Sequence, residues 1–155
     1  MRLPAPNTGF TLIELLVVVS LMAILFSIGV AKYSEFNRRQ IVEQSALGIK
    51  NDLRLIQNKA FTGEKASSCT DDQLLDGWYM SFGDSSYQIY GSCGGAQFSL
   101  ATTDLGDKSI TITSHPGSPI RFRPLGQGVE NSGTITISGP GGIRSIIVTA
   151  SGEIR

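Results

Sequence analysis

Hydrophobic residues follow three different patterns along the chain. Apolar residues run almost unbroken from Phe10 to Ala31, and no charge lies between Leu15 and Ala31, close to the roughly 20 residues that a membrane-spanning helix needs. Between Ile41 and Ala60 apolar residues recur at steps of three and four, as on one face of an amphipathic helix. Because no proline interrupts either stretch, the pattern predicts one helix of about 50 residues, apolar in its first half and amphipathic in its second.

The rest of the chain shows the two-residue period of strands. Short stretches rich in β-forming residues begin at Trp78 and alternate with clusters of Gly, Pro, Asp and Ser. They are WYMSF, SYQIY, AQFSL, SITIT, PIRFR, GTITI and RSIIVTA. GPGG, at Gly139 to Gly142, indicates a hairpin connection between the last two. We therefore expect an α+β fold in which an antiparallel sheet packs against the second half of the long helix.

Glu14 is the single charged residue between Gly9 and Ala31. An ionisable group at membrane depth costs roughly 3 kcal/mol on translocon scales, so it persists where it has a partner. Three interpretations are open: a cleaved secretory signal, a plain anchor that tolerates an acid near its edge, or a segment that moves from the membrane into a protein assembly. Gly29 and Ala31 resemble an export cleavage site, but Glu14 and a helix pattern that continues past Lys32 argue against a removed signal.

Composition and charge exclude several function classes. A length of 155 residues predicts one small domain besides the membrane segment. The chain has 13 basic and 13 acidic residues, so its net charge gives no reason to expect nucleic acid or an anionic surface as a partner. The asymmetry is local, because the segment from Ile120 to Arg155 holds four arginines and two glutamates.

The two cysteines, Cys69 and Cys93, lie in a loop-rich region. Outside the cytoplasm such a pair predicts a disulfide, worth roughly 3 kcal/mol for a loop of this size. A metal site would need more ligands, and the one histidine is His115.

Basic residues give an opposing signal about orientation. Arg2 alone precedes the apolar run, whereas Lys32, Arg38 and Arg39 follow it. The positive-inside rule would then place the following domain in the cytoplasm. The cysteine pair favours the outside, and we expect the domain there.

A polar leader ending in Gly9, then FTLIE and an apolar run, resembles the processing signal of type IV pilins and of the pseudopilins of type II secretion. The resemblance implies that a membrane peptidase cuts between Gly9 and Phe10, that Phe10 is N-methylated, and that Glu14 is kept for assembly. It implies a leader at 1–9, a transmembrane and assembly half-helix at 10–31, an amphipathic half-helix at 32–62 and a globular β-rich domain at 63–155. The implied partners are other pilin or pseudopilin subunits, the prepilin peptidase and methyltransferase, and an assembly platform in the inner membrane, where the chain is a single-pass protein before it enters a pilus or pseudopilus.

The resemblance also suggests a partner for Glu14. Cleavage after Gly9 creates a cationic amine on Phe10, at the head of the helix. In a staggered assembly this amine can meet the Glu14 carboxylate of an adjoining subunit, and the two groups of one chain can pair before assembly. Removal of one partner would leave a buried charge, at a cost of several kcal/mol. Glu14 is therefore interpreted as the residue that sets the register between subunits.

The segment from Pro119 to Arg155 is similar to the globular domain of GspH/FimT-like proteins. The similarity lies in a strand with isoleucine and arginine, PLGQG after it, a hairpin, and a final SGEIR. It implies a minor pilin or pseudopilin, a low-copy subunit that joins or primes a filament.

Some FimT-like members bind DNA through a carboxy-terminal Gly-Arg-x-Arg, where this chain reads Gly152, Glu153, Ile154, Arg155. An acid in place of the first arginine would repel phosphate. A filament-borne receptor for DNA is the alternative function, and it requires the arginines of this region to form one patch. They are Arg121, Arg123, Arg144 and Arg155.

No catalytic or metal site is predicted. His115 has no carboxylate or nucleophile partner evident in the sequence. The acidic residues Asp71, Asp72 and Asp76 do not have the spacing of an EF-hand loop, so a solvated turn is the favoured interpretation over Ca²⁺ binding. The chain is expected to be a structural subunit without a cofactor. It is expected to be a substrate of enzymes and not itself an enzyme.

Overall fold

The computed structural model describes residues 9–65, 68–70 and 72–155, with the backbone alone at 28–31. Helix α1 spans Leu12–Thr62, so the predicted continuous helix is confirmed. The chain forms two compact units, Met1–Phe36 and Asn37–Arg155. The second unit contains the second half of α1 and the strands.

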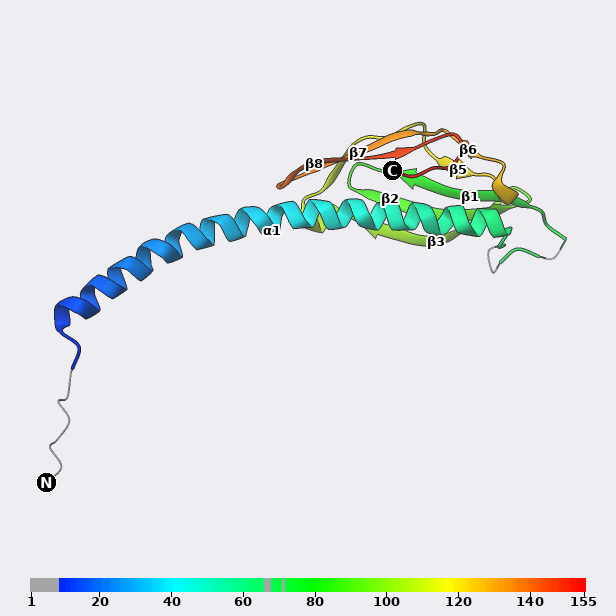
Figure 1. The fold of residues 1–155 in the computed structure, drawn as a ribbon. Helices are drawn as coiled ribbons and strands as arrows, with labels where there is room; N and C mark the ends of the chain where they lie inside the picture. The colour runs from blue at the N-terminus through cyan, green and yellow to red at the C-terminus, as the bar shows by residue number, and fades with distance from the viewer. Residues whose placement is uncertain (1–8, 66–67, 71) are drawn as a thin grey trace, which may run out of the picture. The chain divides into compact units, whose positions relative to one another are not determined.

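In the described residues, eight strands follow α1 (Figure 1). They are β1 (Leu75–Phe82), β2 (Ser86–Cys93), β3 (Ala96–Asp104), β4 (Thr111–Ser114), β5 (Ile120–Phe122), β6 (Val129–Glu130), β7 (Gly133–Gly139) and β8 (Gly142–Val148). Short 3-10 turns lie at η1 (Gly106–Lys108) and η2 (Pro124–Gly126). One sheet has the order β3-β2-β1-β5-β6 and the other the order β4-β7-β8. All the recorded pairings are antiparallel.

The α+β prediction is confirmed, and every β-rich stretch of the sequence contains a strand. Two features differ from the expectation. The strands form two sheets, because β4 pairs with the distant β7 and leaves β5 to pair with β1. Strand β6 was not predicted, because two residues are too short to show a period; Val129 and Glu130 become a strand only by pairing with Phe122 and Arg121.

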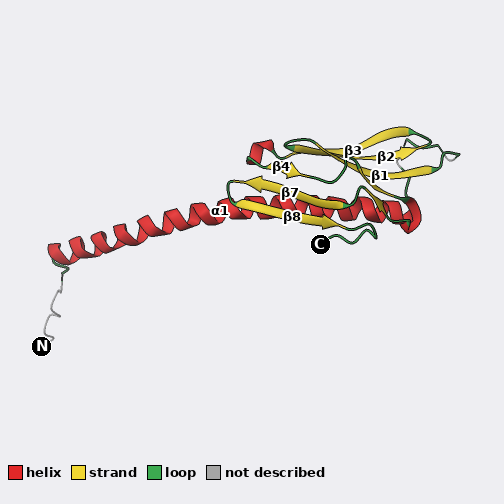
Figure 2. Cartoon of the chain, turned by 90° about the horizontal axis from the view of Figure 1, so that it is seen from above, coloured by secondary structure: helices red, strands yellow, loops and turns green. Residues whose placement is uncertain are grey.

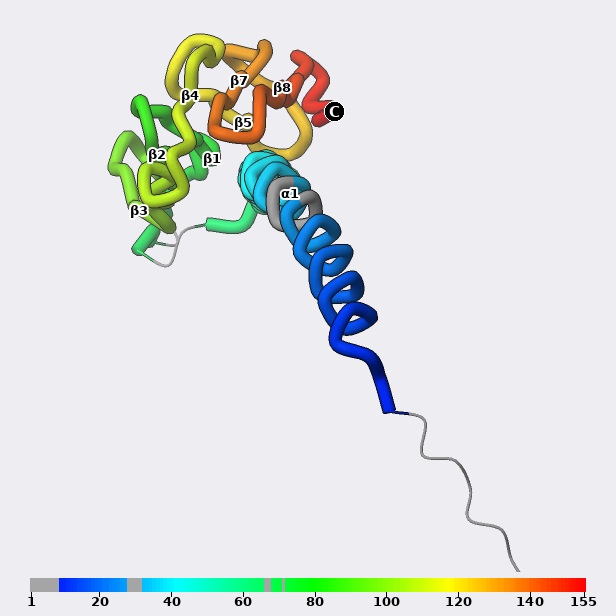
Figure 3. The backbone as a smooth tube through the Cα atoms, turned by 90° about the vertical axis from the view of Figure 1, so that its left-hand side faces the viewer, coloured from blue at the N-terminus to red at the C-terminus, as the bar shows by residue number. Residues whose placement is uncertain are grey.

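One face of the second half of α1 forms the centre of the core. Its buried residues are Val42, Ser45, Ala46, Ile49, Leu53, Ile56 and Ala60. They match the predicted face, except that Ile41 is only partly buried. Both sheets cover this face, with Trp78, Met80 and Ile89 from one and Ile135, Ile137 and Ile146 from the other. Viewed along α1, the strands wrap around one side of the helix (Figure 3). Each fully buried isoleucine or leucine stabilises the fold by roughly 1.5–3 kcal/mol.

The β7–β8 hairpin ends directly against α1 (Figure 2). A Cβ atom on Gly141 would lie 2.2 Å from the carbonyl oxygen of Arg38, so only glycine allows this approach. Beside it, the Arg144 Nε donates to the Glu43 Oε2 at 2.6 Å. The prediction that GPGG connects two strands is confirmed.

Cys69 and Cys93 form a disulfide, the pairing that the sequence predicted. The disulfide ties the connection between α1 and β1 to the end of β2. In the same connection the Trp78 Nε1 donates to the Glu64 carbonyl at 2.8 Å. The long link that follows α1 is thus fixed to the sheet at both of these points.

The Ser45 hydroxyl generates a stability prediction. Ser45 is 3% exposed, and its Oγ has no hydrogen-bond partner among the residues that the structure describes. A buried polar group without a partner is destabilising, so Ser45→Ala should raise the free energy of unfolding by about 1 kcal/mol. Denaturant titration of the full chain in detergent measures this. Ser92→Ala is the matched control and should have the opposite effect, because the Ser92 Oγ donates to Asp76 at 2.8 Å. Loss of stability in Ser45→Ala would contradict the argument.

Tyr87 generates a prediction about pH. Its hydroxyl donates to the Asp52 Oδ2 at 2.6 Å, and burial followed by this bond raises the pKa of Tyr87 to about 12. Unfolded tyrosine titrates near pH 10, so the unfolded state binds fewer protons than the folded state above that pH. The free energy of unfolding should therefore fall as pH rises from about 10 towards 12. Tyr87→Phe should flatten this fall in denaturant titrations, whereas Tyr33→Phe, at an exposed position, should leave it unchanged.

Candidate functional site

The first half of α1 presents an apolar surface that the described fold leaves uncovered. Its exposed large side chains are Leu12, Ile13, Leu15, Leu16, Val17, Val18, Val19, Leu21, Met22, Ile24, Leu25 and Phe26, and Phe10 just before the helix is exposed as well. The helix includes a stretch long and apolar enough to cross a membrane. A contiguous surface of this kind is stable in a bilayer or against other apolar helices, and costly in water.

Thr11 and Glu14 form the start of this helix. The Thr11 Oγ1 accepts a hydrogen bond from the backbone N–H of Glu14 at 3.3 Å. Thr11 is therefore the N-cap, and Glu14 is the third helical residue. A carboxylate in the first turn also interacts favourably with the positive end of the helix dipole. Glu14 thus has a local role in addition to any partner outside the chain.

The N-cap role of Thr11 was missed in the sequence analysis. The signal was present, because Thr11 to Glu14 reads TLIE, and Ser or Thr followed three residues later by Glu is the capping-box pattern. TLIE lies within the apolar run that begins at Phe10, and the membrane segment predicted from this run accounts for the same residues.

Gly9 and Phe10 lie before the first turn of α1. The Phe10 side chain is 84% exposed, and no described atom lies within 4 Å of the position that a Cβ on Gly9 would take. The leader residues before Gly9, Arg2 included, lie outside the described residues. The bond between Gly9 and Phe10 is therefore exposed and lies outside the helix.

Arg121 lies on β5, Arg123 directly follows this strand, and the two share one carboxylate. The Arg123 Nε donates to Glu130 at 2.9 Å, and the Arg121 Nη1 donates to its other oxygen at 3.3 Å. The Arg123 hydrogen bond is the main reason why the pKa of Glu130 is lowered. Arg121 also donates to the Asp76 carbonyl and lies 5.7 Å from the ring of Tyr79.

The other two candidate arginines are also paired with acids. Arg144 bonds Glu43, as described above. Arg155 donates two hydrogen bonds to Glu153, at 2.9 and 3.0 Å, and these lower the pKa of Glu153. Arg144 belongs to the three-stranded sheet, whereas Arg121 belongs to the other and Arg123 directly follows β5. The structure thus brings two of the four arginines together and gives each of the four a carboxylate.

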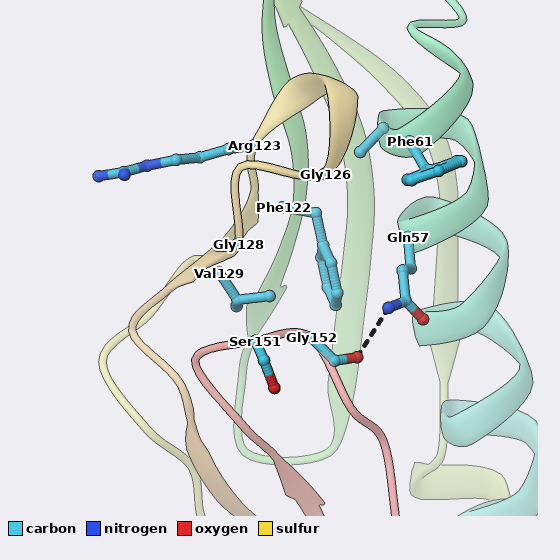
Figure 4. A pocket seen from close by; sticks show the side chains of 10 residues that line it. Gln57, Phe61, Phe122, Arg123, Gly126, Gly128, Val129, Ser151 and Gly152 are labelled. Carbon is cyan, nitrogen blue, oxygen red and sulfur yellow. Dashed lines mark hydrogen bonds between the residues drawn. The ribbon is translucent and has the colours of Figure 1, made fainter.

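A cavity of about 230 Å³ lies between the end of α1, the β5–β6 connection and the carboxy-terminal loop (Figure 4). It is lined by Gln57, Ala60, Phe61, Phe122, Arg123, Gly126, Gly128, Val129, Ser151 and Gly152. The Gln57 Nε2 donates to the Gly152 carbonyl at 2.7 Å, and the Arg123 side chain points away from the cavity. Aromatic walls with a satisfied amide do not form acid–base machinery.

The candidates for metal binding find other roles. No group of three or more metal-binding side chains occurs in the part of the chain that the structure describes, and Asp71 lies outside it. The Asp76 carboxylate accepts from the Gly95 N–H and the Ser92 hydroxyl, each at 2.8 Å, which lowers its pKa. His115 stacks on Phe82 with ring centroids 5.4 Å apart.

Comparison with known proteins identifies the amino-terminal segment. Residues 5–30 match the family model of the prokaryotic N-terminal methylation motif. The type IV major fimbrial protein FimA of Dichelobacter nodosus is 27% identical over 133 residues, which cover 83% of this chain and 85% of that protein. No solved structure gives a significant match.

The motif coincides with the uncovered apolar half of α1 and its capped start, and the likeness to the fimbrial protein continues through the sheet domain. Together, the motif and this likeness support a type IV pilin-like family, a family of structural subunits of a pilus or pseudopilus.

Proposed function

We propose that the chain is made as a single-pass protein of the inner membrane, cleaved between Gly9 and Phe10, N-methylated on Phe10, and then moved into a filament through α1. The division into a leader at 1–9, an assembly half-helix at 10–31, an amphipathic half-helix at 32–62 and a globular domain at 63–155 belongs to this proposal. The observation that carries it is the uncovered apolar surface, with one carboxylate in the first turn of its helix. The sheet domain then lies outside the cytoplasm, where its disulfide is stable.

Glu14 has two tasks in this proposal. Before assembly it stabilises the start of α1 together with Thr11. After cleavage, the new Phe10 amine is a cation at the positive end of the helix dipole, which is unfavourable without an anion nearby. The Glu14 carboxylate of an adjoining subunit supplies that anion inside the apolar bundle, so correct register is stabilised by a compensated charge.

The finer assignment concerns copy number and machine. The similarity of the segment from Pro119 to Arg155 to GspH/FimT-like proteins favours a minor pilin or pseudopilin that primes a filament, with a methyltransferase and an inner-membrane platform as partners. The fimbrial relative is named as a major protein, which favours an abundant subunit. The number of copies per filament separates these two assignments.

The alternative is a filament-borne receptor for DNA. The pair Arg121 and Arg123 is the observation that favours it, because two guanidinium groups that share one carboxylate lie close enough to approach neighbouring phosphates. Glu130 pairs with both and cancels one of the two positive charges, which reduces the counterion release that would drive DNA binding. The structural role is therefore the better supported of the two.

Glu14→Ala tests the structural role. Loss of the carboxylate leaves the Phe10 amine uncompensated at a cost of several kcal/mol, so the chain should fall more than about tenfold in sheared filaments while remaining in membranes. Intact mass should show a mature chain that begins at methylated Phe10 in both the parent and the variant. Ser20→Ala is the control, because it alters another exposed polar side chain of the same half-helix, whose Oγ bonds the Leu16 carbonyl. Normal assembly of Glu14→Ala would refute the pairing argument.

The receptor alternative has its own test. Fluorescence anisotropy with labelled duplex DNA should show no salt-sensitive binding by the full chain, and substitution of Arg121 and Arg123 by Gln should change nothing. Salt-sensitive affinity that is lost in this double variant, with assembly intact, would instead support a DNA receptor.

A further inference from the structure

Both sheets of the globular domain end in a strand with an open side. In the described residues, β3 is the last strand of the five-stranded sheet and β8 is the last strand of the three-stranded sheet. A strand with one unpaired side presents a row of backbone donors and acceptors that another strand can complete.

Strand β3 lacks the usual protection of such an edge. Seven of its nine residues are exposed. From Ala96 to Thr103 it has no charged residue and no proline, the residue types that normally prevent edge pairing. Leu100 is the extra residue of a β-bulge, because Ile89 pairs with Ala101 and the next residue of β2 pairs with Ser99. The regular part that follows the bulge is Ala101–Asp104.

Strand β8 is open over one half only. The carboxy-terminal tail covers its end, where Val148 bridges to Ile154 and Ile147 exchanges two backbone hydrogen bonds with Arg155. The first residues, Gly142–Ile146, have no strand on that side in the described part of the chain. Their one charge, Arg144, is directed to Glu43 of α1 and so does not block the edge.

The two open segments run in opposite directions at the same end of the domain. Strand β8 starts beside Arg38, where Gly141 touches α1, and leads to Gly152, whose carbonyl accepts from Gln57. Strand β3 starts near the other end of α1, since Phe98 lines a cavity with Lys59. It ends shortly before Ile110, which packs beside Val42 and Gly139. The regular half of β3 and the open half of β8 therefore lie at the same level along α1.

The two edges also lie on opposite flanks of the domain. Figure 2 and Figure 3 both show β3 on one side of the strands and β8 on the other. Two copies placed side by side with their α1 helices in the same direction would thus bring β3 of one next to β8 of the other, antiparallel. Such a contact does not close on itself and can repeat along a polar filament.

We infer that, in the filament, Ala101–Asp104 of one copy adds as an antiparallel strand to Gly142–Ile146 of a second copy. The inference rests on the proposed filament function and deepens it by naming the lateral contact between globular domains. Two adjacent copies are enough for it, so it applies to a repeating shaft and to a small initiating cluster. Main-chain hydrogen bonds supply the attraction, and the bulge at Leu100 limits its length.

Thiol cross-linking tests the contact in filaments of the full chain. Thr102 and Ser145 are suitable positions, because both are exposed and both point away from α1. The next residue of β3, Thr103, pairs with Tyr87 on the side that faces α1, so Thr102 faces the other way. In β8, Arg144 reaches Glu43 of α1, so its neighbour Ser145 also faces the other way. With a bifunctional thiol reagent, the double variant Thr102→Cys, Ser145→Cys should give a ladder of dimers, trimers and longer products. Cells that make the two single variants with different tags should give a dimer that carries both tags.

The controls decide the geometry. Thr102→Cys paired with Thr134→Cys is the matched control, because Thr134 is exposed but lies on β7, between two strands, and it should cross-link far less. A dimer from Thr102→Cys alone would mean that β3 pairs with β3 and would overturn the inference. If sheared filaments contain the chain but give no ladder, the strand-pairing inference is overturned and the proposed function stands. Absence of the chain from filaments would overturn the proposed function together with it.

Discussion

Burial of one face of α1 beneath two sheets is the interaction on which the globular domain depends. The strands form two separate sheets, and both pack on the residues between Val42 and Ala60. Backbone hydrogen bonds from Ile112 to Asp84 and from Val129 to Ala150 also link them. Close approach is needed for the packing on α1, and Gly141 supplies it where the β7–β8 hairpin meets the helix backbone at Arg38. The Arg144–Glu43 and Tyr87–Asp52 bonds then fix the rotation of each sheet on the helix.

The same helix satisfies two environments with two distributions of side chains. In its second half, apolar residues occupy one face and the sheets remove them from water. In its first half they occupy every face, and nothing in the described chain covers them. A helix of the second kind needs a bilayer or neighbouring helices, and the proposed function has it pass from one to the other. Glu14 is compatible with both, because the Thr11 cap and the helix dipole favour a carboxylate at this position in any surroundings.

Charge in the globular domain is organised in local pairs. Arg121, Arg123 and Glu130 form one cluster on the outer strands, and Arg155 folds back on Glu153. Exposed pairs of this kind add little stability, but they place a carboxylate beside each of these arginines. This distribution fits a subunit that packs among others of its kind better than one that gathers a polyanion.

The sequence by itself determined the helix, its two halves, the strand stretches, the processing motif and the cysteine pair. These features follow from local or nearly local properties of the chain. They are the period of its apolar residues, the absence of proline from the helix, the spacing of the motif residues and, for the cysteines, a position in one loop-rich region. Tertiary structure decided which strands pair, because registry depends on contacts between residues far apart in the chain. It made β6 a strand through β5, divided the strands into two sheets, and placed Glu130 beside Arg121 and Arg123 and Glu43 beside Arg144. It also left β3 and β8 as open edges. Whether a strand has an open edge depends on which other segments lie beside it in space, and the residues of the strand do not determine this.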